Sequence, residues 1–201
     1  MSRFYLRVVC MLGCLLLAPL AQAFDLNDLS RQLGKHPVVR GPFVQEKHLR
    51  AMARPLTSRG LFVLAADTGL LWQLKTPIAQ DYRINADGIA KRTANGWQMQ
   101  PGNNAAAQQS RLFLALLRGD RTGLEADFTL QLTGTSDNWT LTLTPRALLL
   151  QQIFSHIEIQ GATLVQRIEL FETQGDRTLL KLPDSQASDA LTADERDAFA
   201  D

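Results

Sequence analysis

Apolar and polar residues alternate with a period of two through most of the chain after Pro37. The clearest runs are 128–133 and 139–144, where each apolar residue is followed by a threonine or a glutamine. Such alternation is typical of antiparallel strands with one buried and one wet face, and turn signals such as Asp87-Gly88 and Asn95-Gly96 separate the runs. We predict strands near 42–50, 59–66, 70–75, 80–85, 89–92, 96–100, 126–133, 138–144, 155–160, 163–171 and 177–182.

About eleven consecutive strands with few helices between them predict a mainly β fold, built on one large and strongly curved antiparallel sheet. A short helix over 26–33 is expected before the sheet, because Asp25 can cap it and Gly34 can end it. A second helix is expected over 103–118 and a weaker one over 148–154. From Thr192 to Glu195 the sequence permits either a capping box that starts a last helix or a frayed tail.

The first 23 residues have the pattern of an export signal. A short basic region holds Arg3 and Arg7, an apolar run follows over 8–20, and Ala21-Gln22-Ala23 offers a cleavage site. The apolar run is short for a membrane anchor, and it continues past Cys14, which disfavours a lipoprotein signal. We therefore expect a signal peptide over 1–23, an exported domain over 24–182 and an acidic tail over 183–201.

Composition and charge exclude several functional classes. The chain has 21 basic and 20 acidic residues among its 201, and the resulting net charge of +1 offers no footprint for nucleic acid. Both cysteines, Cys10 and Cys14, lie in the expected signal peptide, so no disulfide or thiolate site is expected in the mature chain.

Motifs that indicate catalysis are also missing from the sequence. The three histidines, His36, His48 and His156, lack metal-ligand spacing, and there is no nucleophile elbow, phosphate loop or dinucleotide fingerprint. We expect no enzyme activity, cofactor or metal, although a catalytic site assembled from distant residues stays open as an alternative.

The remaining feature is the apolar surplus on a curved sheet. The concave face either packs on the helices as ordinary core or leaves a cavity for an apolar ligand. Strand parity groups the side chains by face without showing which face is concave, so each candidate for the cavity wall could equally be plain core. The candidates are Phe62, Leu64, Trp72, Tyr82, Ile84, Trp97, Met99, Phe113, Leu116, Phe128, Leu130, Trp139, Leu141 and Ile168.

Five segments occur in the order found in a known family. These are Gly41–Lys47 with its Phe-x-Gln pattern, Arg59–Leu64, Leu71-Trp72 with a later proline, Asp87-Gly88 and Gln166–Leu182. They are spread over about residues 25–182, which is most of the expected mature chain, and the chain resembles the periplasmic outer-membrane lipoprotein carrier (LolA-like) family.

The resemblance implies an unclosed antiparallel β-barrel of about eleven strands, with short α-helices that act as a lid over a hydrophobic cavity. In this family the cavity takes the acyl chains of lipoproteins between an inner-membrane donor complex and an outer-membrane acceptor. It also implies a monomeric carrier. Each buried methylene contributes about 0.8 kcal/mol, so acyl chains can bind an apolar wall without polar chemistry.

The chain also departs from the family pattern. The family arginine that holds the lid falls on Ala66, the polar residue before the tryptophan is Leu71, and the usual C-terminal ending is missing. These losses fit a divergent carrier for another lipid or lipid-linked product. Two alternatives remain, a sensor that uses the same fold to bind a membrane protein and a hydrolase of lipid esters.

Overall fold

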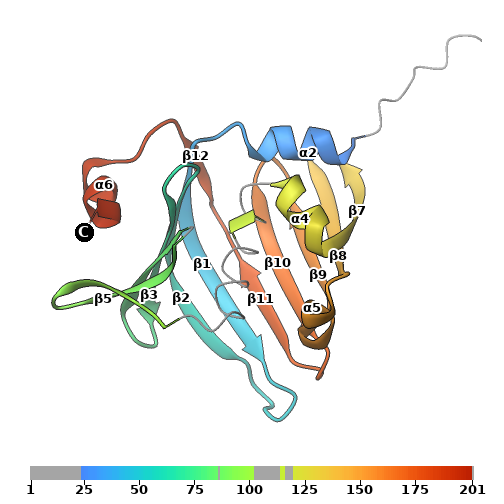
Figure 1. Cartoon of the computed structure of the whole chain (residues 1–201), viewed down its shortest axis with the longest axis horizontal. Coiled ribbons are helices and arrows are strands. Elements are labelled where there is room, and N and C mark those ends of the chain that lie inside the picture. Colours follow the sequence, from blue (N-terminus) through green and yellow to red (C-terminus); the bar gives the residue numbers. More distant parts are fainter. Residues whose placement is uncertain (1–23, 86, 102–113, 116–119, 201) are drawn as a thin grey trace, which may run out of the picture.

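The described strands of the protein form one antiparallel sheet. The structure is a computed structural model that describes residues 24–85, 87–101, 114–115 and 120–200. Among these residues the strand order is β6-β5-β4-β3-β2-β1-β11-β10-β9-β8-β7, with β12 paired to β1. The sheet curves until its two halves face each other and remains open between β6 and β7 (Figure 1). The prediction of a mainly β, unclosed antiparallel barrel is confirmed.

The bounds of the strands are β1 Val38–His48, β2 Leu56–Ala65, β3 Gly69–Thr76, β4 Gln80–Asn85, β5 Gly88–Thr93, β6 Gly96–Met99, β7 Phe128–Thr135, β8 Asn138–Pro145, β9 Phe154–Gly161, β10 Val165–Glu172, β11 Arg177–Lys181 and β12 Gln186–Ser188. The described helices are α2 Leu26–Leu33, α4 Arg121–Asp127, α5 Leu148–Ile153 and α6 Ala193–Ala200.

The first helix, α2, forms as the sequence predicts. The side chain of Asp25 accepts hydrogen bonds from the backbone N–H groups of Asn27 and Asp28 at 2.8 and 2.9 Å, which satisfies donors that a helix start leaves free. Asp28 in turn accepts from the Asp25 N–H at 3.1 Å, completing a capping box. Leu29 and Leu33 are buried, so α2 presents one apolar stripe to the sheet.

The concave side of the sheet holds the main core. The register places Phe62 opposite Trp72 and Trp72 opposite Tyr82, so that these aromatic residues share one face. Phe43 of β1 stacks on Trp72 with ring centroids 3.6 Å apart. The same cluster includes Trp139 and Ile168 from the other half of the sheet. The curvature therefore brings two distant sets of strands around one interior.

The convex side carries a second, smaller cluster under α6. Phe199 packs there with four residues of β1–β3, namely Val38, Val63, Ala65 and Leu71. Glu195 accepts from the Thr192 N–H at 2.7 Å and Thr192 Oγ1 accepts from the Glu195 N–H at 3.2 Å. Of the two readings of this segment, the structure therefore shows the capped helix, which lies outside the curved sheet (Figure 1).

The chain between β6 and β7 contains two further helical segments. Of the helix expected over 103–118, only Leu114 and Ala115 are among the described residues, and Leu114 is buried in the concave core. The sequence analysis did not predict α4, which Asp120 caps and Leu124 anchors.

Candidate functional site

An apolar pocket lies on the concave side where α2 and α4 meet strands β7–β9. Three leucines of α2 and Leu124 of α4 form its cover, and its floor is formed by side chains of the three strands. The lining residues are Leu26, Leu29, Ser30, Leu33, Arg121, Leu124, Leu130, Trp139, Leu141 and Ile159. Eight of these ten side chains are apolar, so the pocket suits a hydrocarbon ligand.

The pocket is almost filled by its own side chains. The void that remains is about 20 Å³, which is the room of a single water molecule. An acyl chain therefore needs more space than this closed arrangement provides. The side chains that occupy the space from above are Leu26, Leu29 and Leu33, which all belong to α2.

Hydrogen bonds hold both ends of α2 over the pocket. The side-chain amide of Gln32 donates to the carbonyl oxygens of Ser136 and Ala162 at 3.1 and 2.6 Å. Near the other end of the helix, Arg121 donates to the side-chain oxygen of Asn27 at 2.6 Å. A hydrogen bond of this kind contributes about 0.5–1.5 kcal/mol net. These three bonds and the contacts of the leucines help to hold the cover in place.

Most of the predicted wall residues do lie on the concave side. Those in its buried core are Phe62, Leu64, Trp72, Phe128, Trp139, Leu141 and Ile168, and those packed against it while partly buried are Tyr82, Ile84 and Leu130. Only Leu130, Trp139 and Leu141 of this set line the pocket itself.

Trp97 and Met99 lie on the opposite face of the sheet, so their placement on the concave wall was wrong. The register pairs Met99 with Ala90, Ala90 with Arg83 and Arg83 with Leu71, which places all four on the face covered by α6. Trp97 shares this face, and its indole N–H donates to the carbonyl of Ala198 at 3.2 Å. Met99 is 49% exposed. Phe113 and Leu116 lie outside the described residues.

The sequence analysis missed the cover of the pocket. It predicted the helix over 26–33 but did not assign its leucines to the site, and it did not predict α4. The capped start and the i, i+3, i+7 spacing of Leu26, Leu29 and Leu33 were the available signal, because a short helix with one apolar stripe must pack that stripe on the sheet.

Charged side chains gather on the outer face. Glu169 of β10 is 4% exposed and lies between the guanidinium groups of Arg167 and Arg177. A hydrogen bond from Lys181 lowers the pKa of Glu46 on the same face. Among the described residues, no group of three or more His, Cys, Asp or Glu side chains could hold a metal ion. None of the described helices is long and apolar enough to span a membrane.

Comparison with known proteins gives one family and several similar folds. The sequence matches the family described as outer membrane lipoprotein carrier protein LolA-like over residues 18–200. No curated protein matches the chain.

A chain in the complex structure of Pseudomonas aeruginosa MucA/MucB aligns with a TM-score of 0.50 at 16% identity, covering 85% of this chain and 58% of that chain. This chain therefore spans little more than half of that protein's length. A LolA superfamily protein from Nitrosomonas europaea aligns with a TM-score of 0.46 at 11% identity, covering 85% of this chain and 96% of that chain.

Proposed function

The chain belongs to the family of LolA-like outer membrane lipoprotein carrier proteins, and we propose that it is a periplasmic carrier that binds lipid acyl chains on the concave side of its sheet. The apolar pocket beneath α2 is the observation that carries the proposal. Its wall offers hydrocarbon contact, Arg121 is the charged residue in its lining, and the clusters around Glu169 and Glu46 lie on the other face.

In the proposed mechanism, an acyl chain replaces the leucines of α2 in the pocket. A fully buried leucine side chain contributes about 1.5–3 kcal/mol, so the three leucines, of which Leu26 is partly buried, together contribute at most about 9 kcal/mol. An acyl chain of similar carbon number would recover the same free energy when it takes their place. Because the burial free energies of the leucines and of the acyl chain are similar, a small shift in the free energy of the closed position of α2 is enough to load or release the ligand.

The cargo we propose is a lipid or lipid-linked product other than the usual lipoprotein. Ala66 stands where the resemblance places the family arginine, so a lock through that side chain is missing. Here Gln32 and Arg121 hold α2 through hydrogen bonds to Ser136, Ala162 and Asn27. Because residues other than the family arginine hold α2 over the pocket, a cargo other than the usual lipoprotein is consistent with this arrangement.

Displacement of a fluorescent fatty acid from the purified protein tests the proposal. Leu130 is partly buried and lines the pocket, whereas Leu132 is the next inward residue of the same strand and does not line it. We expect Leu130→Asn to weaken binding about tenfold, because it removes apolar contact from the wall. Leu132→Asn is the matched control and should bind like the wild type. Equal binding by the two variants would exclude the pocket as the ligand site.

A second candidate function is that of a sensor that binds a membrane protein. The fold resembles a chain of a structure that contains two proteins in complex, which favours this alternative. Capture of a protein partner by the delipidated chain, together with failure to bind any fatty acid, would support the sensor in place of the carrier.

A further inference from the structure

Exposed apolar side chains concentrate at one end of the barrel. Met52 is 47% exposed, Leu56 50%, Ile78 75%, Leu148 78% and Leu149 46%. We call these five residues the apolar rim. Single exposed apolar residues are ordinary on a protein surface, but several gathered at one place indicate an interaction site.

Strand direction places the apolar rim at a single end. Strand β1 runs toward His48, and β2 starts at the same end because the two strands are antiparallel. By the same alternation, the connections 49–55, 77–79, 94–95, 146–153 and 173–176 all lie there. In Figure 1 the β1–β2 hairpin and α5 lie at the lower end of the molecule, away from α2.

The connections at this end carry more basic than acidic residues. In the five connections the basic residues are Arg50, Arg54 and Arg146, which are all exposed. The acidic residue there is Asp176, which is half-buried and accepts a hydrogen bond from the backbone N–H of Arg50 at 2.8 Å. At the strand ends beside these connections, Lys75 is exposed and Glu172 pairs with Lys47 at 3.9 Å.

We propose that this end of the barrel docks on the surface of a lipid bilayer that carries anionic headgroups. The arginines match the negative charge of the headgroups, and the apolar rim enters the boundary between headgroups and acyl chains. Four of the rim residues stand on three separate connections and Leu56 begins β2, an arrangement that suits insertion of several points into a fluid surface.

Helix α5 joins this end to the interior of the barrel. Leu148 and Leu149 are exposed on its first turn, whereas the next residue, Leu150, is 3% exposed and belongs to the concave core. Docking would therefore bring the helix that contributes Leu150 to the concave core against the lipid. The inference does not depend on the ligand in the pocket, since it concerns a separate surface.

Flotation with lipid vesicles tests the docking surface. The protein used begins at Phe24, because the apolar residues 8–20 would bind vesicles by themselves. Vesicles of phosphatidylglycerol and phosphatidylethanolamine in equal parts should bind the protein, and phosphatidylcholine vesicles should bind it much less. Added salt should weaken the binding by screening the charges.

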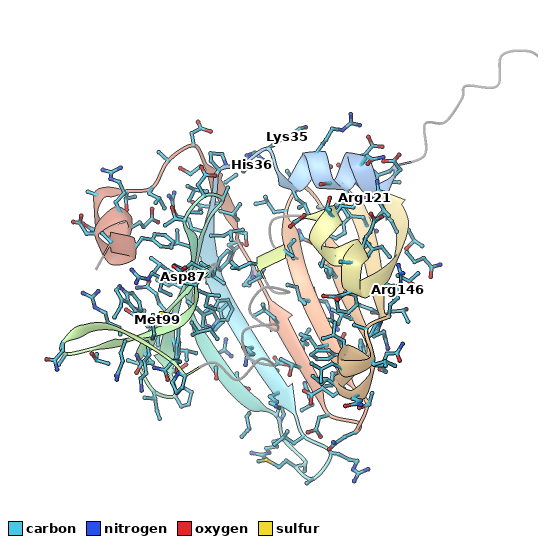
Figure 2. The ribbon with its side chains drawn as sticks, in the orientation of Figure 1. Lys35, His36, Asp87, Met99, Arg121 and Arg146 are labelled. Atoms are coloured by element: carbon cyan, nitrogen blue, oxygen red, sulfur yellow. The ribbon has the colours of Figure 1, made fainter. Side chains whose placement is uncertain are left out.

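Matched variants separate the rim from the rest of the surface. The double variant Leu148→Ser with Leu149→Ser should bind at least about tenfold more weakly, whereas Leu61→Ser, at a residue 45% exposed on the outer face of β2, should bind normally. Arg50→Gln and Arg54→Gln should each weaken binding about fivefold. The control for charge is Lys35→Gln, at the opposite end of the molecule (Figure 2).

Three results would overturn the proposal. They are a folded wild-type protein that does not float with anionic vesicles, equal binding to neutral vesicles, and equal losses in the rim and control variants. The pocket variant Leu130→Asn should float normally. Failure of the docking surface is therefore distinguishable from failure of the carrier function.

Discussion

Truncation of Leu29 separates a movable cover from an ordinary core residue. Leu29 is 3% exposed and lines the pocket from α2. The change Leu29→Ala removes three carbon atoms, which lose about 2.4 kcal/mol of transfer free energy at about 0.8 kcal/mol each. The enlarged void adds a further cost, so the free energy of unfolding of the empty protein should fall by about 3–4 kcal/mol.

The same change should strengthen ligand binding. If an acyl chain displaces α2, the wild-type protein loses the burial of Leu29 on loading, whereas the variant has already lost it. Loading therefore costs the variant less free energy than it costs the wild type. We expect its affinity for the fatty acid to be about tenfold higher, which is equivalent to roughly 1.4 kcal/mol. Urea unfolding of the empty protein and displacement of a fluorescent fatty acid measure the two effects.

Leu71 supplies the matched control. It is 2% exposed, but it packs under α6 in the cluster on the convex side. Leu71→Ala should lose comparable stability and leave affinity unchanged. If Leu29→Ala also loses stability with unchanged or weaker affinity, α2 is a fixed part of the core and the cover reasoning is refuted.

Four further results are expected. Burial opposes ionisation of Glu195, but hydrogen bonds from Arg40 and Thr192 outweigh it and lower the pKa of its carboxyl group. The ionised Glu195 therefore stabilises the fold above the pKa of an unfolded glutamate, about 4.3. This stabilisation is lost as the pH falls through the lower pKa of the folded state. In urea unfolding across this pH range, the free energy of unfolding should fall less in Glu195→Gln than in the wild type. Gly60→Ala should cost about 2–3 kcal/mol or more in the same assay, since the added Cβ would lie 2.0 Å from the carbonyl oxygen of Gln73, and an unchanged stability would contradict the packing described. N-terminal sequencing of the exported protein should find Phe24 first, and an acylated cysteine would contradict the signal assignment. EDTA should leave fatty-acid binding unchanged, whereas a loss restored by zinc would reveal a metal site built from distant residues.

Local patterns were sufficient to predict most of the elements. The alternation in 139–144 fixes which side chains of β8 share a face, and the structure buries Trp139, Leu141 and Leu143 together. Likewise, the cap at Asp25 is a short-range hydrogen-bonding preference that the sequence shows directly. In both cases the determining interactions lie within one strand or one helical turn.

Elements fixed by distant contacts were not predictable in this way. Strand β12 has three residues, Gln186–Ser188, and exists through its pairing with β1. The face of Trp97 depends on the register of four successive strands, which an aromatic residue in one short strand does not reveal. Curvature, which decides which face is concave, is likewise a property of the whole sheet.

Native mass spectrometry of the protein, extracted gently from the cells that produce it, tests the carrier function most directly. The account predicts a monomer with an additional mass that fragments to a lipid with acyl chains, and loss of that mass on addition of excess fatty acid. A bare chain mass, together with no binding of fatty acid to the folded protein, would contradict the account.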